Sequence, residues 1–332
     1  MKGILFVGHG SRDAEGNEHL LQFTSRVEER LRQDTEGLLY ETCFLELTRP
    51  TIGQGVKKIV ERGATDVGIV PLMLFQAGHA KLHIPHEIDE AKARYPHVQF
   101  NYGRPIGVHE EMVEILTDRL LHSTNFGLEE ELKESAILLV GRGSSDSDAN
   151  SDLCKIARLL WEKTKVSNVE VAYMGVTFPD LEQGLARCVK QGAKQIYVLP
   201  YLLFTGILLK RMAGVIDTFN QQNTGVTASM SEALGFHEKL EGIVADRSME
   251  ALQGRALANC DHCQFRKLVV FDHHHHDHEH DHDHDHHDHE HDHHDHDHDH
   301  DDHEHDHDHD HDDHEHDHDH DHSHEKKREI KI

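Results

Sequence analysis

Residues 4–13 read ILFVGHGSRD, and this stretch decides the fold that we expect. Its apolar run has the length of a strand and no alternating polar positions, which is typical of a parallel strand covered on both faces. Gly8 and Gly10 let the backbone turn sharply, so His9 should stand at the carboxyl end of that strand. Ligands of open α/β sheets bind at this edge. The alternative is a histidine in an ordinary strand-to-helix turn.

The charge is distributed unevenly along the 332 residues, which suffice for two domains. The formal net charge is -28, but residues 272–332 alone hold 26 acidic and 4 basic residues. Residues 1–271 therefore hold 36 acidic and 30 basic residues, a balance typical of globular domains. We expect a folded body and a separate acidic tail.

Composition also limits the compartment. There is no apolar run of about 18 residues and no signal-peptide pattern, so we expect no membrane span. The odd number and irregular spacing of the cysteines argue against a disulfide framework and predict a cytoplasmic protein. The five are Cys43, Cys154, Cys188, Cys260 and Cys263, of which the first three fall in predicted core elements.

The chain contains an internal repeat. Residues 137–146, ILLVGRGSSD, repeat residues 4–13, and residues 169–181 repeat residues 40–52 in their apolar, proline and threonine positions. Strands and helices alternate in both copies, which predicts two similar open parallel-sheet α/β lobes that face each other across a cleft. We expect the lobes at 1–124 and 134–250, a linker at 251–271 and a disordered tail at 272–332.

Three polar positions break the repeat. A duplicated scaffold needs its glycines and apolar residues twice, but it needs its chemistry only once. Two imidazoles and one carboxylate at the ends of neighbouring parallel strands could hold a divalent metal, accept protons or assist phosphoryl transfer. The candidate catalytic residues are His9, Glu46 and His79, which the second copy replaces with Arg142, Gly175 and Leu208.

The short motifs around these residues resemble those of a known family. They are VGHGSR at 7–12, FLE at 44–46, PT at 50–51, PLMLF at 71–75 and HAKLHIP at 79–85. Together they resemble the class II sirohydrochlorin chelatases over about residues 1–250. The two-lobed chain with a His-rich segment is most similar to the long cobaltochelatase form of anaerobic cobalamin biosynthesis. His83 departs from the acidic residue found in many relatives.

The resemblance implies a lyase-type enzyme that inserts Co²⁺, or alternatively Fe²⁺ or Ni²⁺, into sirohydrochlorin without a nucleotide. It implies that His9 and His79 are catalytic and bind the metal, with Glu46 as the active-site carboxylate. Two pyrrole protons must leave, and neutral histidines can accept them. The substrate carries eight carboxylates, so its pocket should supply cations and polar groups. The substrate-binding candidates are Ser11, Arg12, Arg49, Lys81, Arg142 and Lys210, with Arg104 and Arg211 also placed near strand ends.

A nucleotide site is not expected, because neither glycine pair has the third glycine of a dinucleotide motif. Cys260 and Cys263 form a C-x-x-C pair that could bind a metal through thiolates or ligate an iron–sulfur cluster. Either site needs further ligands, which a homodimer or external thiols could supply. A redox pair and two plain linker thiols are the alternatives.

The tail has an extreme composition. Residues 272–325 contain 28 histidines, 25 acidic residues and one serine, with no apolar residue to support a core. Such a segment offers many weak sites for Co²⁺, Ni²⁺ or Zn²⁺, and we expect it to collect metal for the enzyme. A solubilising acidic run is the alternative. The basic residues 326–328 are too few to predict nucleic-acid binding.

Other functions stay open at this stage. A sirohydrochlorin ferrochelatase for siroheme would use similar ligands. A metal storage protein or metallochaperone would make the tail the functional part, but it leaves the one-sided set of His9, Glu46 and His79 unexplained. A histidine phosphatase would carry an arginine directly before the histidine, where this chain has Gly8.

Overall fold

The computed structural model describes residues 1–123 and 133–254. They belong to the first of two compact units, which runs from Met1 to Asp272. The expected tail and most of the expected linker, including Cys260 and Cys263, lie outside the described residues, which end at position 254. The first two residues of the expected linker, 251 and 252, belong to the last described helix. No helix in the described part is long and apolar enough to cross a membrane.

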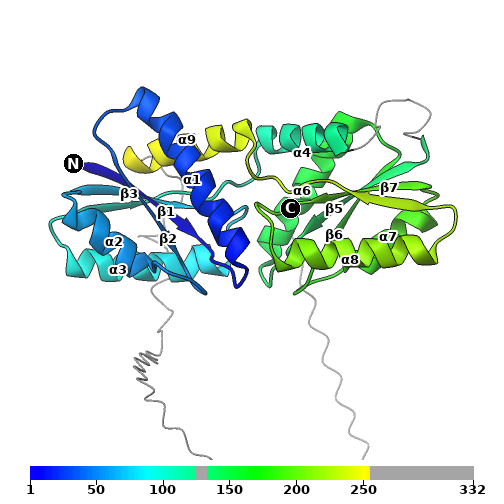
Figure 1. Ribbon diagram of the computed structural model, residues 1–332, viewed down its shortest axis with the longest axis horizontal. Helices are drawn as coiled ribbons and strands as arrows, with labels where there is room; N and C mark the ends of the chain where they lie inside the picture. The colour runs from blue at the N-terminus through cyan, green and yellow to red at the C-terminus, as the bar shows by residue number, and fades with distance from the viewer. Residues whose placement is uncertain (124–132, 255–332) are drawn as a thin grey trace, which may run out of the picture. The chain divides into compact units, whose positions relative to one another are not determined.

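Two parallel sheets of four strands form the framework (Figure 1). The first has the strand order β2-β1-β3-β4 and the second the matching order β6-β5-β7-β8. The strands are β1 (Lys2–Gly8), β2 (Leu39–Phe44), β3 (Asp66–Pro71), β4 (Gln99–Tyr102), β5 (Ser135–Gly141), β6 (Asn168–Tyr173), β7 (Gln195–Pro200) and β8 (Thr227–Met230). This confirms two similar open parallel-sheet α/β lobes.

Helices cover both faces of each sheet. They are α1 (Ala14–Asp34), α2 (Ile52–Glu61), the π-helical turn η1 (His79–His83), α3 (Ile84–Arg94), α4 (Glu110–Ser123), α6 (Ser147–Thr164), α7 (Leu181–Lys190), α8 (Ile207–Gln222) and α9 (Glu238–Leu252). In the first sheet α1 packs on one face with α9, and α2 packs on the other with α3. Ile4, Leu5, Phe6 and Val7 are all fully buried, which confirms that β1 is covered on both sides.

The helix starts follow from short polar caps. The side chain of Asp13 accepts a hydrogen bond from the backbone of Glu15 at the start of α1, and Asp146 does the same for Asp148 at α6. Thr51 and Gln54 form a capping box at α2. β2 ends at Phe44, and the chain then leaves the extended conformation and reaches a φ of +65° at Leu47.

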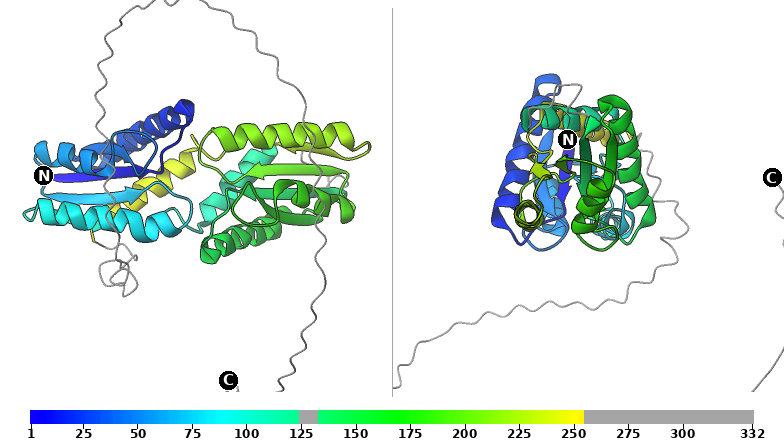
Figure 2. Two further views of the ribbon diagram at one scale, coloured as in Figure 1. Left: turned by 90° about the horizontal axis from the view of Figure 1, so that it is seen from below. Right: turned by 90° about the vertical axis from the view of Figure 1, so that its right-hand side faces the viewer.

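The last helix of each half packs against the sheet of the other half. Helix α4 follows β4 in the sequence but contacts α6 and β7, whereas α9 follows β8 and contacts α1 and β3 (Figures 1 and 2). The two halves of the sequence are therefore exchanged at their ends. The chain crosses between the halves after β4 and again before α9.

Close approach fixes α9 on the first sheet. A Cβ atom at Gly68 of β3 would lie 3.2 Å from the Cβ of Ala251, so glycine leaves room for the helix. The buried Arg247 of α9 donates to the carbonyls of Pro105 and Ile106 at 3.3 and 3.2 Å. Because buried carbonyls need partners, this arginine ties the helix to the segment after β4.

One apolar cluster contains residues of both halves. It includes Phe6 of β1 and Leu139 of β5, and the stacked rings of Phe75 and Tyr201 lie 5.2 Å apart across the two halves. The expectation that three cysteines lie in the core needs one correction. Cys43 and Cys188 are buried, but Cys154 is exposed because it lies on the outer face of α6.

Candidate functional site

His9 follows directly on β1, at the carboxyl edge of the first sheet. The ladder with β2 continues past both strands, since the amide of Leu45 donates to the carbonyl of Gly8 at 2.9 Å and that of Glu46 to the carbonyl of His9 at 3.1 Å. Gly10 has a φ of +89°, and a Cβ there would lie 1.8 Å from the carbonyl oxygen of Glu46. Only glycine allows this contact, which holds His9 and Glu46 on adjacent turns.

The imidazole of His9 lies between two kinds of partner. Its Nδ1 lies 3.5 Å from Oε1 of Glu46 and 3.3 Å from the carbonyl oxygen of Gly10. On the other side of the ring, Nη1 of Arg142 lies 2.9 Å from Nε2. The side chains of His9 and Glu46 are 25% and 41% exposed, so both can be reached by a ligand. The structure thus brings together two of the three predicted catalytic side chains.

His79 is placed only through its backbone. It is the first residue of η1, in the segment that follows β3, and its side chain lies outside what the structure describes. Single π-helical turns occur frequently at functional sites. Among the described residues no group of three or more histidine, cysteine or acidic side chains is placed to hold a metal ion. The predicted third member of the site stays a prediction.

Two lysines join the halves in a reciprocal manner. Nζ of Lys81 lies 2.6 Å from Oδ2 of Asp146, while Nζ of Lys210 lies 2.8 Å from Oδ2 of Asp13. Lys81 also reaches Asp148 at 3.5 Å, and Lys210 reaches Glu15 at 3.0 Å. Each lysine therefore binds the acidic start of the first helix in the other half. We call these the lysine clamps, Lys81–Asp146 and Lys210–Asp13.

The clamps change the electrostatics of their acids. The hydrogen bond from Lys210 lowers the pKa of Asp13, and that from Lys81 lowers the pKa of Asp146. Burial is the largest single effect on Lys81 and lowers its pKa, but the hydrogen bonds and charges of Asp146 and Asp148 together outweigh burial and raise the pKa of the lysine. Both clamps are therefore ionised at neutral pH.

Sequence reasoning identified Lys81 and Lys210 but not their partners. The signal was present, because the repeat that relates His9 to Arg142 also relates Asp13 to Asp146, and both acids are followed by a helix. Polar residues conserved between the two copies are candidates for contacts across an axis of symmetry.

The other predicted substrate-binding residues have mixed surroundings. The hydroxyl of Ser11 accepts a hydrogen bond from the amide of Asp13 at 3.0 Å, a turn contact that Ser144 repeats in the second half. Arg104 pairs with Glu250 of α9 at 2.7 Å and so stabilises the fold. The exposed residues Arg12, Arg49 and Arg211 have no side-chain partner within the described ranges.

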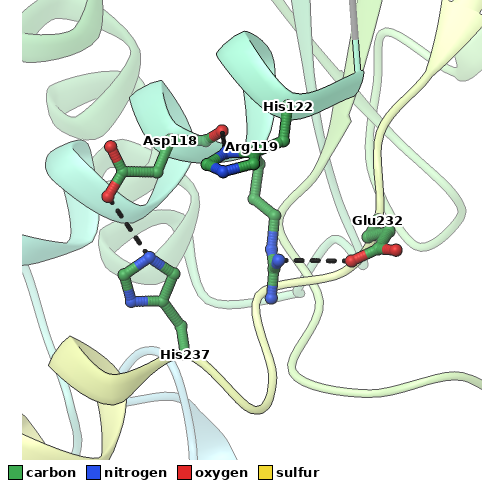
Figure 3. A pocket seen from close by; sticks show the side chains of 5 residues that line it. All are labelled: Asp118, Arg119, His122, Glu232 and His237. Carbon is green, nitrogen blue, oxygen red and sulfur yellow. Dashed lines mark hydrogen bonds and ion pairs between the residues drawn. The ribbon is translucent and has the colours of Figure 1, made fainter.

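A separate pocket of about 370 Å³ lies where α4 ends and the chain enters α9. Figure 3 shows Nε2 of His237 beside Asp118 and the guanidinium of Arg119 beside Glu232, at 3.3 and 3.2 Å. None of the predicted site residues lines it. These two pairs join α4 to the segment before α9, at one of the crossings between the halves.

The arrangement at His9 suits metal and proton transfer. Both acceptors on the Nδ1 side favour the tautomer with its hydrogen on Nδ1, which leaves the lone pair on Nε2. A carboxylate behind a histidine is the usual outer partner of a metal-ligating imidazole, since it fixes the ring and its tautomer. Glu46 stands in that position relative to His9.

Comparisons with known proteins agree with this chemistry. A family model described as CbiX matches residues 3–123 and 136–251. A sirohydrochlorin cobaltochelatase of Priestia megaterium is 51% identical over 277 residues, covering 82% of this chain and 88% of the relative. A sirohydrochlorin ferrochelatase of the same organism is 39% identical, covering 77% and 92%. The structure of SirB from Bacillus subtilis with Fe³⁺ is similar, with a TM-score of 0.65 and 32% identity, covering 76% of this chain and 96% of that one.

Proposed function

The chain belongs to the CbiX family, and from this premise we propose that it is a sirohydrochlorin chelatase that inserts Co²⁺ without a nucleotide. The observation that carries the proposal is the pair of His9 and Glu46 at the carboxyl edge of the first sheet, 3.5 Å apart, which the second half lacks. Cobalt is favoured over iron because identity to the cobaltochelatase exceeds that to the ferrochelatase, 51% against 39%. The pathway would be cobalamin biosynthesis.

The proposed reaction uses the two sides of the His9 ring. Glu46 and the carbonyl of Gly10 orient Nδ1, so that Nε2 can bind the incoming substrate metal or accept a pyrrole proton. Insertion releases two protons from the macrocycle, and His79 is the proposed second acceptor and ligand. The carboxylate of Glu46 would stabilise the positive charge that develops on the imidazole.

Cations at the same edge are the proposed partners of the substrate carboxylates. Lys81, Lys210 and Arg142 all contact the opposite half there, and Arg12 and Arg49 are exposed on loops after β1 and β2. In the clamps the substrate carboxylates would compete with Asp146 and Asp13. The hydroxyl oxygen of Ser11 accepts from the amide of Asp13, and Ser11 could donate its hydroxyl hydrogen to a substrate carboxylate without losing that bond.

Further parts of the proposal rest on sequence alone. They are a metal-collecting role for residues 272–332, a thiolate or iron–sulfur site at Cys260 and Cys263, a homodimer that would complete such a site, and a cytoplasmic location. The division of the chain into lobes at 1–124 and 134–250 also stays a proposal. These bounds describe the two copies of the sequence repeat. The packing of α4 and α9 suggests that neither unit is complete without the other.

Anaerobic absorbance spectroscopy of sirohydrochlorin tests the proposal. The full chain should accelerate Co²⁺ insertion above the uncatalysed rate without any nucleotide, and faster than Fe²⁺ insertion. A chain that ends at Phe271 should keep this turnover, because His9, Glu46, His79 and Arg142 all precede that position. A full chain that binds Co²⁺ but shows only the uncatalysed rate would favour metal storage instead.

A further inference from the structure

His9 contacts the residue that takes its place in the second half, Arg142. Arg142 stands in the second repeat where His9 stands in the first, 133 residues earlier, and its Nη1 lies 2.9 Å from Nε2 of His9. Both residues follow the first strand of their sheets. The clamps Lys81–Asp146 and Lys210–Asp13 are also related by the repeat, so the two halves meet at this edge through reciprocal contacts.

The chemistry of the two groups fixes the direction of the hydrogen bond. A guanidinium has donors only and keeps its proton in proteins, so Nε2 of His9 must be the acceptor. On the other side of the ring, Nδ1 faces Oε1 of Glu46 and the carbonyl of Gly10, which are both acceptors. Arg142 thus occupies the lone pair of Nε2, and a metal ion would need that same lone pair.

The surroundings of Arg142 leave its charge available. Its side chain is exposed, and within the described ranges no carboxylate is paired with it. Lys81 and Lys210, by contrast, already have carboxylate partners at 2.6 and 2.8 Å. An arginine fork matches a carboxylate in a bidentate manner, which a neutral imidazole nitrogen cannot offer. A substrate with many carboxylates is therefore a better partner for Arg142 than His9 is.

We propose that Arg142 is a positioning residue that covers Nε2 of His9 until a polycarboxylate tetrapyrrole binds, and that it then moves to a substrate carboxylate and exposes the nitrogen to the metal. This inference rests on the proposed function. Its consequence is an order of binding, with the tetrapyrrole first and Co²⁺ second. A metal ion that arrives first meets an imidazole whose metal-binding nitrogen is occupied.

The test compares the full-length protein with Arg142→Ala and Arg142→Lys. Initial rates of Co²⁺ insertion are measured with each substrate varied in turn at a subsaturating concentration of the other, so that enzyme without bound tetrapyrrole contributes to the rate. A metal buffer fixes free Co²⁺ so that binding elsewhere on the chain does not alter it. Arg187→Ala is the matched control, because Arg187 is an exposed arginine of the second half in the last turn of α7, away from the carboxyl ends of the strands.

Arg142→Ala should shift the two Michaelis constants in opposite directions. The KM for Co²⁺ should fall and the KM for sirohydrochlorin should rise, each by about three- to tenfold, the scale of one charge-assisted hydrogen bond at a partly exposed site. Arg142→Lys should recover only part of the sirohydrochlorin KM, because a lysine restores the charge without the bidentate fork. Arg187→Ala should change neither.

Two results would overturn the inference. Unchanged constants in Arg142→Ala would show that the contact with His9 does not control metal access. A rise in both constants with a loss of kcat would indicate a general structural role. If the folded wild type itself gives no catalysed insertion, the proposed function is wrong and the role of Arg142 falls with it.

Discussion

Gly10→Ala probes the contact that holds His9 and Glu46 together. Gly10 has a φ of +89°, and its added Cβ would lie 1.8 Å from the carbonyl oxygen of Glu46. Ordinary contact begins near 3.4 Å, so the turn after β2 must move by more than 1 Å. That displacement would pull Glu46 away from Nδ1 of His9, and the 3.5 Å separation would be lost.

The magnitude divides into two parts. An alanine in the left-handed region costs about 1 kcal/mol, partly offset because alanine lowers the entropy of the unfolded chain. Overpacking against a backbone that cannot yield adds about 1–3 kcal/mol. Gly37→Ala isolates the first part, since Gly37 has a φ of +72° and nothing within 4 Å of its added Cβ.

Urea unfolding and the metal-insertion assay together provide the measurement. Gly10→Ala should lower the free energy of unfolding by about 1–3 kcal/mol more than Gly37→Ala does, and it should lower kcat strongly where Gly37→Ala leaves it unchanged. Gly143→Ala, whose Cβ would lie 2.0 Å from the carbonyl oxygen of Gly175, should match the stability loss. Equal unfolding curves for Gly10→Ala and Gly37→Ala, with equal rates, would refute this reasoning.

Three further predictions concern single side chains. Glu46→Gln should lower the insertion rate about 10- to 100-fold and leave the urea unfolding curve unchanged, because the side chain orients His9 and is 41% exposed; a wild-type rate would contradict this role. Asp146→Asn should lower the free energy of unfolding by less than about 1 kcal/mol at neutral pH, because the clamp is partly exposed. Since Lys81 lowers the pKa of Asp146, the difference from wild type should be present above the ordinary value of 3.8 and vanish as the pH falls through the lowered pKa; a difference that grows in acid would contradict the assignment. Arg247→Met should cost about 2 kcal/mol or more in urea unfolding, because the carbonyls of Pro105 and Ile106 lose a buried donor, whereas the exposed Arg187→Met should cost almost nothing.

The repeat made most of the fold predictable. Matching apolar runs, glycines and helix caps in residues 4–13 and 137–146 lead directly to two parallel sheets, because buried parallel strands have few alternatives. The exchange of α4 and α9 could not be predicted. An amphipathic pattern indicates that a helix buries one face but not against which sheet, and the choice depends on tertiary features such as the room that Gly68 leaves for Ala251.

The candidate site was predictable in its residues and less so in its contacts. The asymmetry of the repeat identified His9 and Glu46, which the structure places 3.5 Å apart. The same asymmetry identified Arg142 as the residue that replaces His9 in the second copy, but only the structure shows that it contacts Nε2 of His9. A contact between two halves depends on their mutual orientation, which local sequence patterns do not encode.

The most direct test of the account compares His9→Ala with His97→Ala in the anaerobic Co²⁺ insertion assay. His97 is an exposed histidine just before β4, near the amino ends of the strands, whereas His9 lies at their carboxyl ends. It therefore controls for the loss of one imidazole. The account predicts that His97→Ala inserts Co²⁺ into sirohydrochlorin at the wild-type rate and that His9→Ala falls to the uncatalysed rate. Wild-type turnover in a folded His9→Ala would contradict the central claim that metal transfer takes place at the edge formed by His9 and Glu46.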